Sequence, residues 1–340
     1  MSRPSVILGV ISHDTPENLL AALVSAGPYV DRALVLFSGR DDPCVPLLVS
    51  FSATHYDVSC DFLDADCESK RNRCLDLARP LGEWVLMLDT DERLLPGGRL
   101  PDLASADPII DAFLLESRSG GVSHRMPRLV RSSSRARFGG GGIHEALIGL
   151  GPSVPWDHLP YDGTPRARSS DEYLMHARAL ATRLERDPTD ARAAFYLASS
   201  LRDAGDLPNA LAAYVRRANM TGAFAEENFW SWVYAGRIAW ALGLPWEAVE
   251  SFFRYAITWG PDRAEPRRDL ARLYAGWGRP AYARLETELA DALAYPTTAT
   301  LFVERTAYAP HRIDRDAAST ASPSPAQVTA YGRSTQAPPP

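Results

Sequence analysis

Residues Glu83 to Glu92 read EWVLMLDTDE, an apolar run that ends in three carboxylates. An unbroken apolar run of this length is typical of a strand that is buried on both faces of a parallel sheet. In open α/β sheets, ligands bind beyond the carboxyl ends of the strands. The sequence therefore predicts a buried strand at Glu83–Leu88 and places Asp89 and Asp91 at the ligand-binding edge of an α/β domain.

Short apolar runs alternate with helical stretches along the first half of the chain. This alternation is typical of βαβ units. The predicted strands are Ser5–Ile11, Ala33–Phe37, Asp61–Leu63, Ala112–Glu116, Met126–Val130 and Ile143–Leu147, and the predicted helices are Glu17–Ala26 and Ser69–Ala78. We therefore expect residues 1–165 to form an α/β nucleotide-binding domain of the Rossmann-like type.

A change of pattern follows this region. Prolines and glycines interrupt any regular element from Gly151 to Pro165, and a long helical region begins near Ser170. Such a cluster of turn-forming residues predicts a domain boundary.

The helical region carries a repeat of small residues. Gly205, Gly243 and Gly278 are 38 and then 35 residues apart, and an alanine follows each of them by five residues. The spacings bracket the ~34-residue period of tetratricopeptide (TPR) repeats, whose small residues let two antiparallel helices approach closely. Residues 170–295 are therefore predicted to be an all-α, TPR-like helical array, with an ordinary helical bundle as the alternative. Residues 314–340 are rich in Ser, Pro and Ala, which predicts a disordered tail.

The composition narrows the class of protein. The chain has 340 residues, 46% of them hydrophobic, and its 36 basic and 42 acidic residues give a net charge of −6. An acidic chain argues against a surface built to coat nucleic acid. The four cysteines form no C-x-x-C pair, so neither a zinc ribbon nor a secreted disulfide framework is indicated. No apolar run reaches the ~18 residues of a membrane span, and we expect a soluble, cytoplasmic protein with free thiols.

Asp89 and Asp91 carry the clearest chemical signal in the sequence. Two carboxylates two residues apart at the edge of a sheet suit a hard divalent cation with oxygen ligands, which then bridges the negative charge of a diphosphate. The alternative is an Asp-rich turn that only caps the next helix. Because the pair directly follows a buried strand, we favour a metal site.

Three segments resemble a known family. They are Ser69–Leu94 (SKRNRCLDLARPLGEWVLMLDTDERL), Arg125–Leu147 (RMPRLVRSSSRARFGGGGIHEAL) and Phe195–Ala218 (FYLASSLRDAGDLPNALAAYVRRA). Together they resemble the bacterial family 2 glycosyltransferases of GT-A fold that carry a TPR-like C-terminal region. The resemblance implies a GT-A domain, a nucleotide-diphosphate sugar donor, Mn²⁺ or Mg²⁺, and a hexosyltransferase-type reaction with inversion. By the habit of this family, the donor is a UDP-sugar.

The resemblance also implies roles for residues near the donor. Asp89 and Asp91 match the metal-binding D-x-D motif, with Asp91 favoured as the direct ligand. Arg71 and Asn72 match an R-N pair on a helix that faces the nucleotide. Arg128 matches an arginine in the strand before the glycine run, where a bidentate fork neutralises phosphate. For Arg71 the alternative is an ordinary solvated helix face, since exposed arginines are the rule.

Near the acceptor, His144 and Glu145 match the V-H-E signature of the family. An inverting transfer needs a general base that takes the acceptor proton as the oxygen or sulfur attacks the anomeric carbon, and Glu145 is the candidate. His144 then orients the base, binds the metal or contacts the acceptor, and the alternative for both residues is an exposed polar turn. His158 matches a histidine that closes such domains, and we expect it either to complete the metal shell or to have a structural role.

Two functions from different classes are consistent with these residues. The first is a metal-dependent glycosyltransferase whose helical array presents or selects the acceptor. The second is a TPR-type protein-binding scaffold in which the GT-A domain is inactive, and retained hydrolysis of the donor with metal distinguishes the two. The acceptor stays open between a peptide, a glycan, a modified nucleobase and a small molecule.

Overall fold

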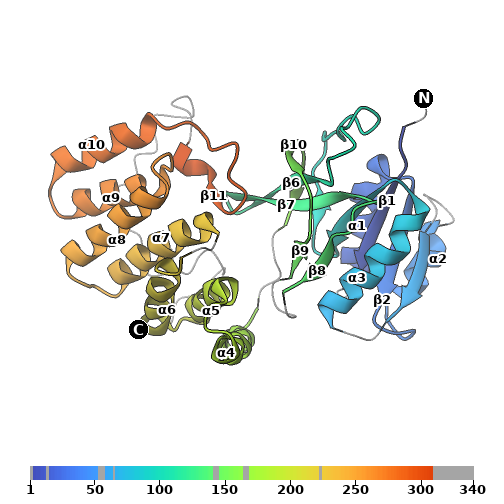
Figure 1. Cartoon of the computed structure of the whole chain (residues 1–340), viewed down its shortest axis with the longest axis horizontal. Coiled ribbons are helices and arrows are strands. Elements are labelled where there is room, and N and C mark those ends of the chain that lie inside the picture. The colour runs from blue at the N-terminus through green and yellow to red at the C-terminus, as the bar shows by residue number, and fades with distance from the viewer. Residues whose placement is uncertain are drawn as a thin grey trace. The chain divides into compact units, whose positions relative to one another are not determined.

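The computed structural model describes residues 3–12, 15–52, 58–63, 66–140, 145–163, 168–221 and 224–308. The chain divides into two compact units, Met1–Arg166 and Ala167–Pro340. Figure 1 shows a sheet with helices in the first unit and helices packed on one another in the second. An α/β region followed by a helical region is the order that the sequence predicted.

Most of the described strands of the first unit form one sheet, in the order β3-β2-β1-β4-β7-β6-β10-β5. Their bounds are β1 Val6–Ile11, β2 Arg32–Phe37, β3 Val58–Phe62, β4 Trp84–Asp89, β5 Arg93–Leu94, β6 Ala112–Ser119, β7 Val122–Arg131 and β10 Ser153–Asp162. β3, β2, β1 and β4 are parallel neighbours, whereas β7 pairs antiparallel with both β4 and β6. The sheet is therefore mixed, and β4, the strand predicted at Glu83–Leu88, lies where its parallel half ends.

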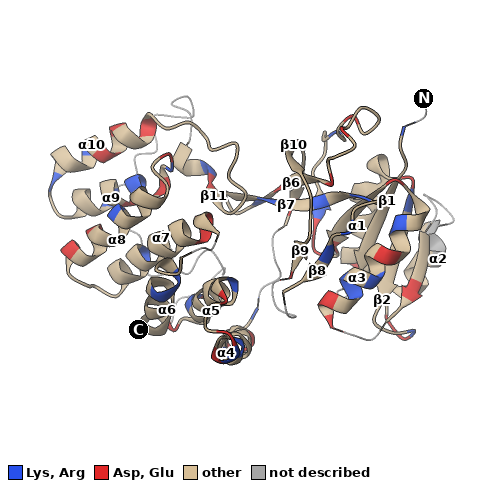
Figure 2. Ribbon diagram, viewed as in Figure 1, with Lys and Arg blue, Asp and Glu red and all other residues tan. Residues whose placement is uncertain are grey.

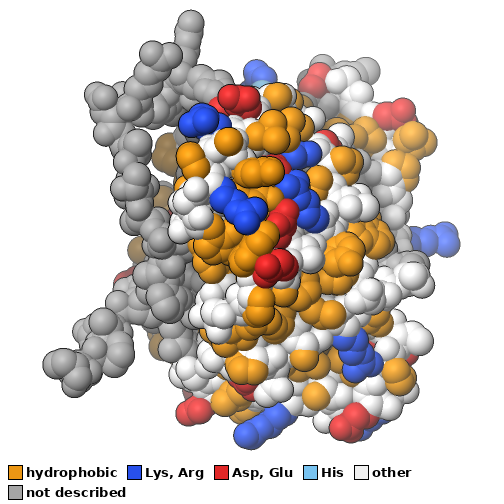
Figure 3. Space-filling model, turned by 90° about the vertical axis from the view of Figure 1, so that its left-hand side faces the viewer, with side chains coloured by type: hydrophobic (Ala, Val, Ile, Leu, Met, Phe, Trp, Pro, Cys, Tyr) orange, Lys and Arg blue, Asp and Glu red, His pale blue; other side chains and the backbone are white. Residues whose placement is uncertain are grey.

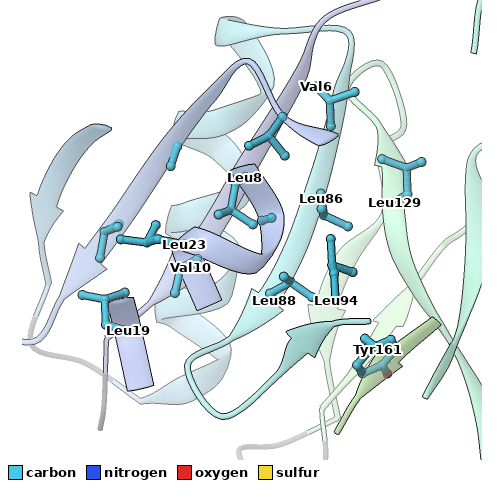
Figure 4. Close-up of a cluster of buried hydrophobic side chains, with 14 of the residues drawn as sticks. Val6, Leu8, Val10, Leu19, Leu23, Leu86, Leu88, Leu94, Leu129 and Tyr161 are labelled. Carbon is cyan, nitrogen blue, oxygen red and sulfur yellow. The ribbon is translucent and has the colours of Figure 1, made fainter. Parts of the chain in front are cut away.

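Helices cover both faces of the parallel half. The helical elements are α1 Pro16–Ala26, α2 Val45–Ser52 and α3 Cys67–Ala78, with short 3-10 turns η1 Gly27–Tyr29 and η2 Arg79–Leu81. Val6 and Leu8 of β1 belong to one core with Leu19 and Leu23 of α1 (Figure 4). Ile7, between them in sequence, belongs to the core that α3 covers on the opposite face. Burial on both faces is the reason for the unbroken apolar runs in these strands.

A second, smaller element of the first unit is the β8–β9 ribbon, formed by β8 (Arg137–Gly139) and β9 (Ala146–Ile148). The two strands are antiparallel, and Gly139 pairs with Ala146. The strand predicted at Ile143–Leu147 overlaps β9 in part.

β10 was not predicted, because Pro155 and Pro160 interrupt its sequence. The register of β10 with β6 shifts between Trp156 and Tyr161, and prolines are tolerated at such irregularities and at strand edges. Pro160 still contributes a carbonyl, which accepts a hydrogen bond from the backbone N–H of Leu95 at 2.9 Å. The prolines therefore interrupt the pairing of the strand without ending it.

The second unit contains seven α-helices within the described residues. They are α4 Ser170–Arg186, α5 Ala191–Ala204, α6 Leu207–Ala218, α7 Ala225–Ala241, α8 Trp246–Trp259, α9 Glu265–Gly276 and α10 Pro280–Asp291. Helices that follow one another in sequence pack together, and Phe195 and Trp230 are among the aromatic residues that fill their core. Tyr255, Trp259 and Tyr282 are exposed instead. Figure 3 shows one face of this unit, where hydrophobic side chains lie among scattered charged ones.

The repeated glycines lie at the turns between paired helices. Gly205, Gly243 and Gly278 follow α5, α7 and α9, with φ values of 90°, 69° and 68°. Glycine adopts this left-handed conformation without the steric cost that a Cβ imposes. The regular spacing in the sequence therefore marks three successive helical hairpins, α5–α6, α7–α8 and α9–α10.

A segment after α10 is fastened to the helices. We call residues 299–308 the C-terminal segment; it contains β11 (Val303–Glu304) and the 3-10 turn η3 (Arg305–Tyr308). The backbone N–H of Leu301 donates to Glu226 at 2.8 Å, and the Phe302 carbonyl accepts from Trp230 Nε1 at 2.8 Å and from Arg263 at 2.6 Å. These contacts tie the chain up to Tyr308 into the helical unit. The predicted tail, residues 314–340, lies outside the described residues.

Two expectations from composition can be compared with the structure. Cys44 and Cys74 are buried, Cys60 and Cys67 are exposed, and all four are free thiols, as predicted. In the described ranges, no helix combines the length and the apolar character needed to cross a membrane.

The conformation at Gly243 makes a prediction about stability. Gly243→Ala should lower the free energy of unfolding by about 1 kcal/mol, because alanine is strained at a positive φ. Gly276→Ala is the matched control, since Gly276 is the last residue of α9 and an added Cβ there meets open space. Chemical denaturation measures both variants. Equal stability of the two would contradict the role assigned to the turn glycines.

Candidate functional site

The carboxyl ends of the parallel strands meet at one edge of the sheet. Ile11, the last residue of β1, pairs with Asp89 at the end of β4 and with Leu36 of β2. Leu36 in turn pairs with Asp61 of β3. Asp89 therefore lies at the edge where ligands bind in open α/β sheets, which is the position that the sequence predicted for it.

The residues from Asp89 to Arg93 form a tight turn between β4 and β5, which we call the acidic turn. The backbone N–H of Glu92 donates to the Asp89 carbonyl at 3.0 Å, and the Asp89 N–H donates to Glu92 Oε2 at 3.0 Å. Arg93 Nη1 donates to the carbonyls of Thr90 and Glu92 at 2.5 and 2.7 Å. The turn is therefore fixed by its own side chains as well as by its backbone.

Two arginines hold the Asp89 carboxylate. Arg71, on the charged helix α3 (Figure 2), makes a bidentate pair with it, with Nη1–Oδ1 at 2.7 Å and Nη2–Oδ2 at 3.0 Å. Arg128 of β7 lies 3.5 Å from the same Oδ2 atom. Burial disfavours the charge on Arg71, but the attraction of Asp89 outweighs it and raises the pKa of Arg71. The structure thus brings three of the predicted site residues together.

Arg128 is a buried cation that also pairs with the Glu92 carboxylate. Its Nε donates to the Tyr161 hydroxyl at 3.4 Å, and its guanidinium lies 5.4 Å from the centre of the Tyr161 ring. Burial opposes the charge, but Glu92, Tyr161 and Asp89 together raise the pKa of Arg128 well above its ordinary value. Burial raises the pKa of Glu92 to about 7 and that of Tyr161 to about 12, in both cases against the opposing effect of Arg128.

A β-bulge accounts for the position of Arg128. The register of β7 with β6 passes from Leu129–Phe113 to Pro127–Leu114, so Arg128 is the extra residue on β7. Bulges bend a strand and re-aim side chains, and they are common next to functional sites. Arg128 is buried, and so are Leu129 and Val130, the next two residues of the strand.

Glu145 lies beside Arg71. Its Oε2 is 3.9 Å from Arg71 Nε, and its side chain is 10% exposed. Its Oε1 is buried and has no hydrogen-bond partner among the described residues. A carboxylate oxygen in this state has a lone pair available for a proton. His144, the residue before it, lies outside the described residues, so its predicted roles stay predictions.

Asn72 is next to Arg71 on α3, but its amide is engaged elsewhere. Its Nδ2 donates to the Phe138 carbonyl at 2.8 Å, and its Oδ1 accepts from the Phe138 backbone N–H at 2.8 Å. Both ends of the amide are therefore used on the β8–β9 ribbon, whereas the sequence predicted a contact with the nucleotide.

The predicted metal ligands are only partly brought together. Among the described residues, no group of three or more His, Cys, Asp or Glu side chains is arranged around a common metal position. The Asp91 carboxylate is half-buried and lies close enough to Glu92 to contribute to raising its pKa. Because Mg²⁺ is often bound by one or two carboxylates together with substrate phosphates, Asp91 fits such a cation as a single protein ligand. Asp89 is already held by arginines.

His158 lies on β10, and its ring packs edge-on against Trp156 at 5.0 Å between the ring centres. Its backbone carbonyl accepts a hydrogen bond from the N–H of Arg99 at 2.8 Å. In the described part of the chain nothing joins it to Asp89 or Asp91, so the metal role predicted for it has no support there.

The sequence analysis missed the structural roles of three residues of the site: Glu92, Arg93 and Tyr161. Glu92 and Arg93 directly follow the D-x-D motif, and a charged residue that is buried after an apolar strand is a signal of pairing. The partner of Glu92 is 36 residues away in sequence, which no local pattern indicates.

Comparisons with known proteins give only distant similarities. No family model matches the chain, and no curated protein matches it either. Among solved structures, it is similar to S. aureus TarS 1–349 in complex with UDP-GlcNAc, with 15% identity and a TM-score of 0.38 over 86% of this chain and 93% of that chain. The complex of the same protein with UDP gives 15% identity and a TM-score of 0.37, over 84% and 90% of the two chains.

A crystal structure of MamA is similar to a smaller part of the chain. It has 17% identity and a TM-score of 0.30, over 37% of this chain and 74% of that chain. The TM-scores of these structures are all below 0.5, so the function has to be argued from the residues of the site itself.

The buried pair of Arg128 and Glu92 makes a prediction about stability. Arg128→Met should lower the free energy of unfolding by about 3–5 kcal/mol, because it leaves a buried carboxylate without its cation. Adding Glu92→Gln should recover part of this loss, since the uncompensated charge is then removed. Urea denaturation measures the single and double variants.

The matched control is Arg73→Met, because Arg73 also pairs with a carboxylate. Its pair with Asp61 is partly exposed, with side-chain exposures of 48% and 33%, and exposed pairs contribute only about 0–1 kcal/mol. A loss at Arg128 no larger than that at Arg73 would show that the buried pair does not hold the acidic turn.

Proposed function

We propose that the chain is a glycosyltransferase that moves a sugar from a nucleotide-diphosphate donor, with UDP as the favoured nucleotide, to an acceptor with inversion. The observation that carries this proposal is the position of Glu145. A buried carboxylate with one oxygen lacking a hydrogen bond among the described residues lies beside an arginine that is bound to the carboxylate at the end of β4. This arrangement combines a proton acceptor with a cationic site for a leaving group.

The charge balance of the site supports a divalent cation. Three cations, Arg71, Arg93 and Arg128, are close to four carboxylates, Asp89, Asp91, Glu92 and Glu145. An excess of carboxylates repels a diphosphate. A cation on Asp91 would reverse this repulsion, and when bound, Mn²⁺ or Mg²⁺ supplies a Lewis acid that neutralises charge on the leaving diphosphate.

The arginines also contribute to binding of the donor in this proposal. A guanidinium presents a planar fork that matches the oxygens of a phosphate as well as those of a carboxylate. Arg71 is 18% exposed, whereas Arg128 is 8% exposed and is held by Glu92. We therefore assign the contact with the diphosphate to Arg71 and the support of the acidic turn to Arg128.

Glu145 would act on the acceptor. In an inverting transfer the base takes the proton from the attacking oxygen or sulfur while the bond between the sugar and the diphosphate breaks. Its Oε2 faces Arg71, and its Oε1 is the atom that would take the proton. The helical unit, in this proposal, selects the acceptor.

Asp91 tests the metal assignment. Asp91→Ala should abolish Mn²⁺-dependent binding of UDP, because it removes the proposed protein ligand, while the fold stays intact. Titration calorimetry of UDP with and without Mn²⁺ measures this. Asp102→Ala is the matched control. Among the described residues, the Asp102 carboxylate accepts hydrogen bonds only from Ala104 and Ser105, so this variant should bind UDP as the unchanged protein does. Unchanged UDP affinity in Asp91→Ala would overturn the metal assignment.

Glu145 tests the reaction itself. Glu145→Gln should lower kcat by about 10²–10⁴-fold, as expected for loss of a general base. Its affinity for the donor should stay near normal, because the side chain acts in the transfer step. Turnover of a UDP-sugar measures the rate, and Glu17→Gln, on the exposed first turn of α1, is the control. Full turnover in Glu145→Gln would exclude Glu145 as the base.

Glu92 and Asp111 are the alternatives to Glu145 as the base, and both are already engaged. Glu92 pairs with Arg128. Asp111 Oδ2 accepts from Ser134 Oγ at 2.9 Å and from the Gly151 N–H at 2.8 Å, and it precedes β6 at the opposite end from the acidic turn. These contacts leave Glu145 as the candidate with an available oxygen.

A further inference from the structure

The β8–β9 ribbon is fastened to α3 by side chains of the helix. Asn72 binds both backbone groups of Phe138, at 2.8 Å each. Arg79, just after the helix, donates to the Ala136 carbonyl at 2.7 Å. An amide that binds the N–H and the C=O of one residue replaces the two hydrogen bonds that a neighbouring strand would supply. Asn72 is therefore the point at which the ribbon is held in register with α3.

The ribbon carries the candidate base. Gly139, next to Phe138, pairs with Ala146 of β9, and Glu145 is the residue before Ala146. The position of the Glu145 backbone is therefore set by where β8 lies. A shift of β8 along α3 would move Glu145 by a similar distance.

The same contact also places the partner of Glu145. The Arg71 guanidinium lies 5.5 Å from the centre of the Phe138 ring, a distance typical of a cation–π contact. Arg71 in turn reaches both Asp89 and Glu145. Phe138, held by Asn72 through its backbone, thus packs against the arginine that joins the acidic turn to the base.

We propose that Asn72 is a positioning residue, which sets Glu145 and Arg71 against each other by holding Phe138. The proposal rests on the proposed function, in which Glu145 is the base. It differs from the expectation that Asn72 contacts the nucleotide, because both ends of its amide are already used. Asparagine is suited to this role because its side chain has a donor and an acceptor of the same geometry as a peptide group.

The test uses Asn72→Ala and Asn72→Asp in the full chain. Alanine removes both hydrogen bonds to Phe138, whereas aspartate keeps the acceptor for the Phe138 N–H and loses the donor for its carbonyl. Hydrogen exchange at the Phe138 amide, followed by mass spectrometry, should rise in Asn72→Ala and stay near the unchanged protein in Asn72→Asp. This measurement does not depend on any activity.

Kinetics give the second readout. Misplacement of a reacting group by about 1 Å costs up to ~10²-fold in rate, so kcat should fall by about 10- to 100-fold in Asn72→Ala. The KM for the donor should change by less than about twofold, because Asn72 does not contact the donor in this proposal and Arg71, which does, is still held by Asp89. The kcat of Asn72→Asp should lie between that of Asn72→Ala and that of the unchanged protein.

Arg137→Ala is the matched control. Arg137 also joins β8 to α3, through Asp76, but both side chains are about half exposed and such pairs contribute little. In Arg137→Ala, hydrogen exchange at the Phe138 amide and kcat should both match those of the unchanged protein.

The outcomes separate the two proposals. Unchanged exchange at Phe138 in Asn72→Ala, or a raised donor KM with unchanged kcat, would overturn the positioning role. The latter result would make Asn72 a donor contact after all. Failure of the unchanged protein to transfer sugar would overturn the proposed function, and a rise in exchange would still support the anchoring of the ribbon by Asn72.

Discussion

The insertion of two guanidinium groups among a cluster of carboxylates is the interaction on which the rest of the first unit depends. Buried charges are costly unless each is paired and hydrogen-bonded. Arg71 and Arg128 supply those pairs to Asp89 and Glu92, and they come from a helix and from a bulged strand that are far apart in sequence. The sheet order, the bulge and the packing of α3 together bring the two arginines to the acidic turn.

Within this cluster, the same type of side chain has different roles because its surroundings differ. Asp89 and Glu92 are held by arginines and shape the turn, whereas Glu145 has an oxygen without a hydrogen bond among the described residues. This separation resembles the way in which paired carboxylates in enzymes are given distinct tasks by burial and neighbouring charge. A D-x-D motif in a sequence therefore does not define two equivalent ligands. In this chain the first aspartate is bound by Arg71, and the second is the proposed metal ligand.

Local patterns in the sequence predicted β4 and the repeat of the helical hairpins, because both depend on short-range chemistry. The apolar run before Asp89 indicates a strand that is buried on both faces. Glycine is favoured where φ is positive, as it is at Gly243. The pairing of Arg128 with Glu92 depends on a bulge and on register, which no local pattern encodes. For the same reason the sequence does not indicate the contact of Asn72 with Phe138, which joins residues 66 positions apart. The sequence predicted the positions of Asp89, Arg71 and Arg128 near one another, but not the pairs that they form.

The C-terminal segment changes how the helical unit can unfold. In an array of hairpins that touch only their neighbours, each pair can open by itself, so that stability is a sum of local terms. Here the carbonyl of Phe302 binds Trp230 of α7 and Arg263 before α9, which spans the intervening helix α8. Opening either hairpin therefore breaks a hydrogen bond of the C-terminal segment. The segment thus couples the α7–α8 hairpin to the α9–α10 hairpin, in addition to the direct packing of neighbouring helices.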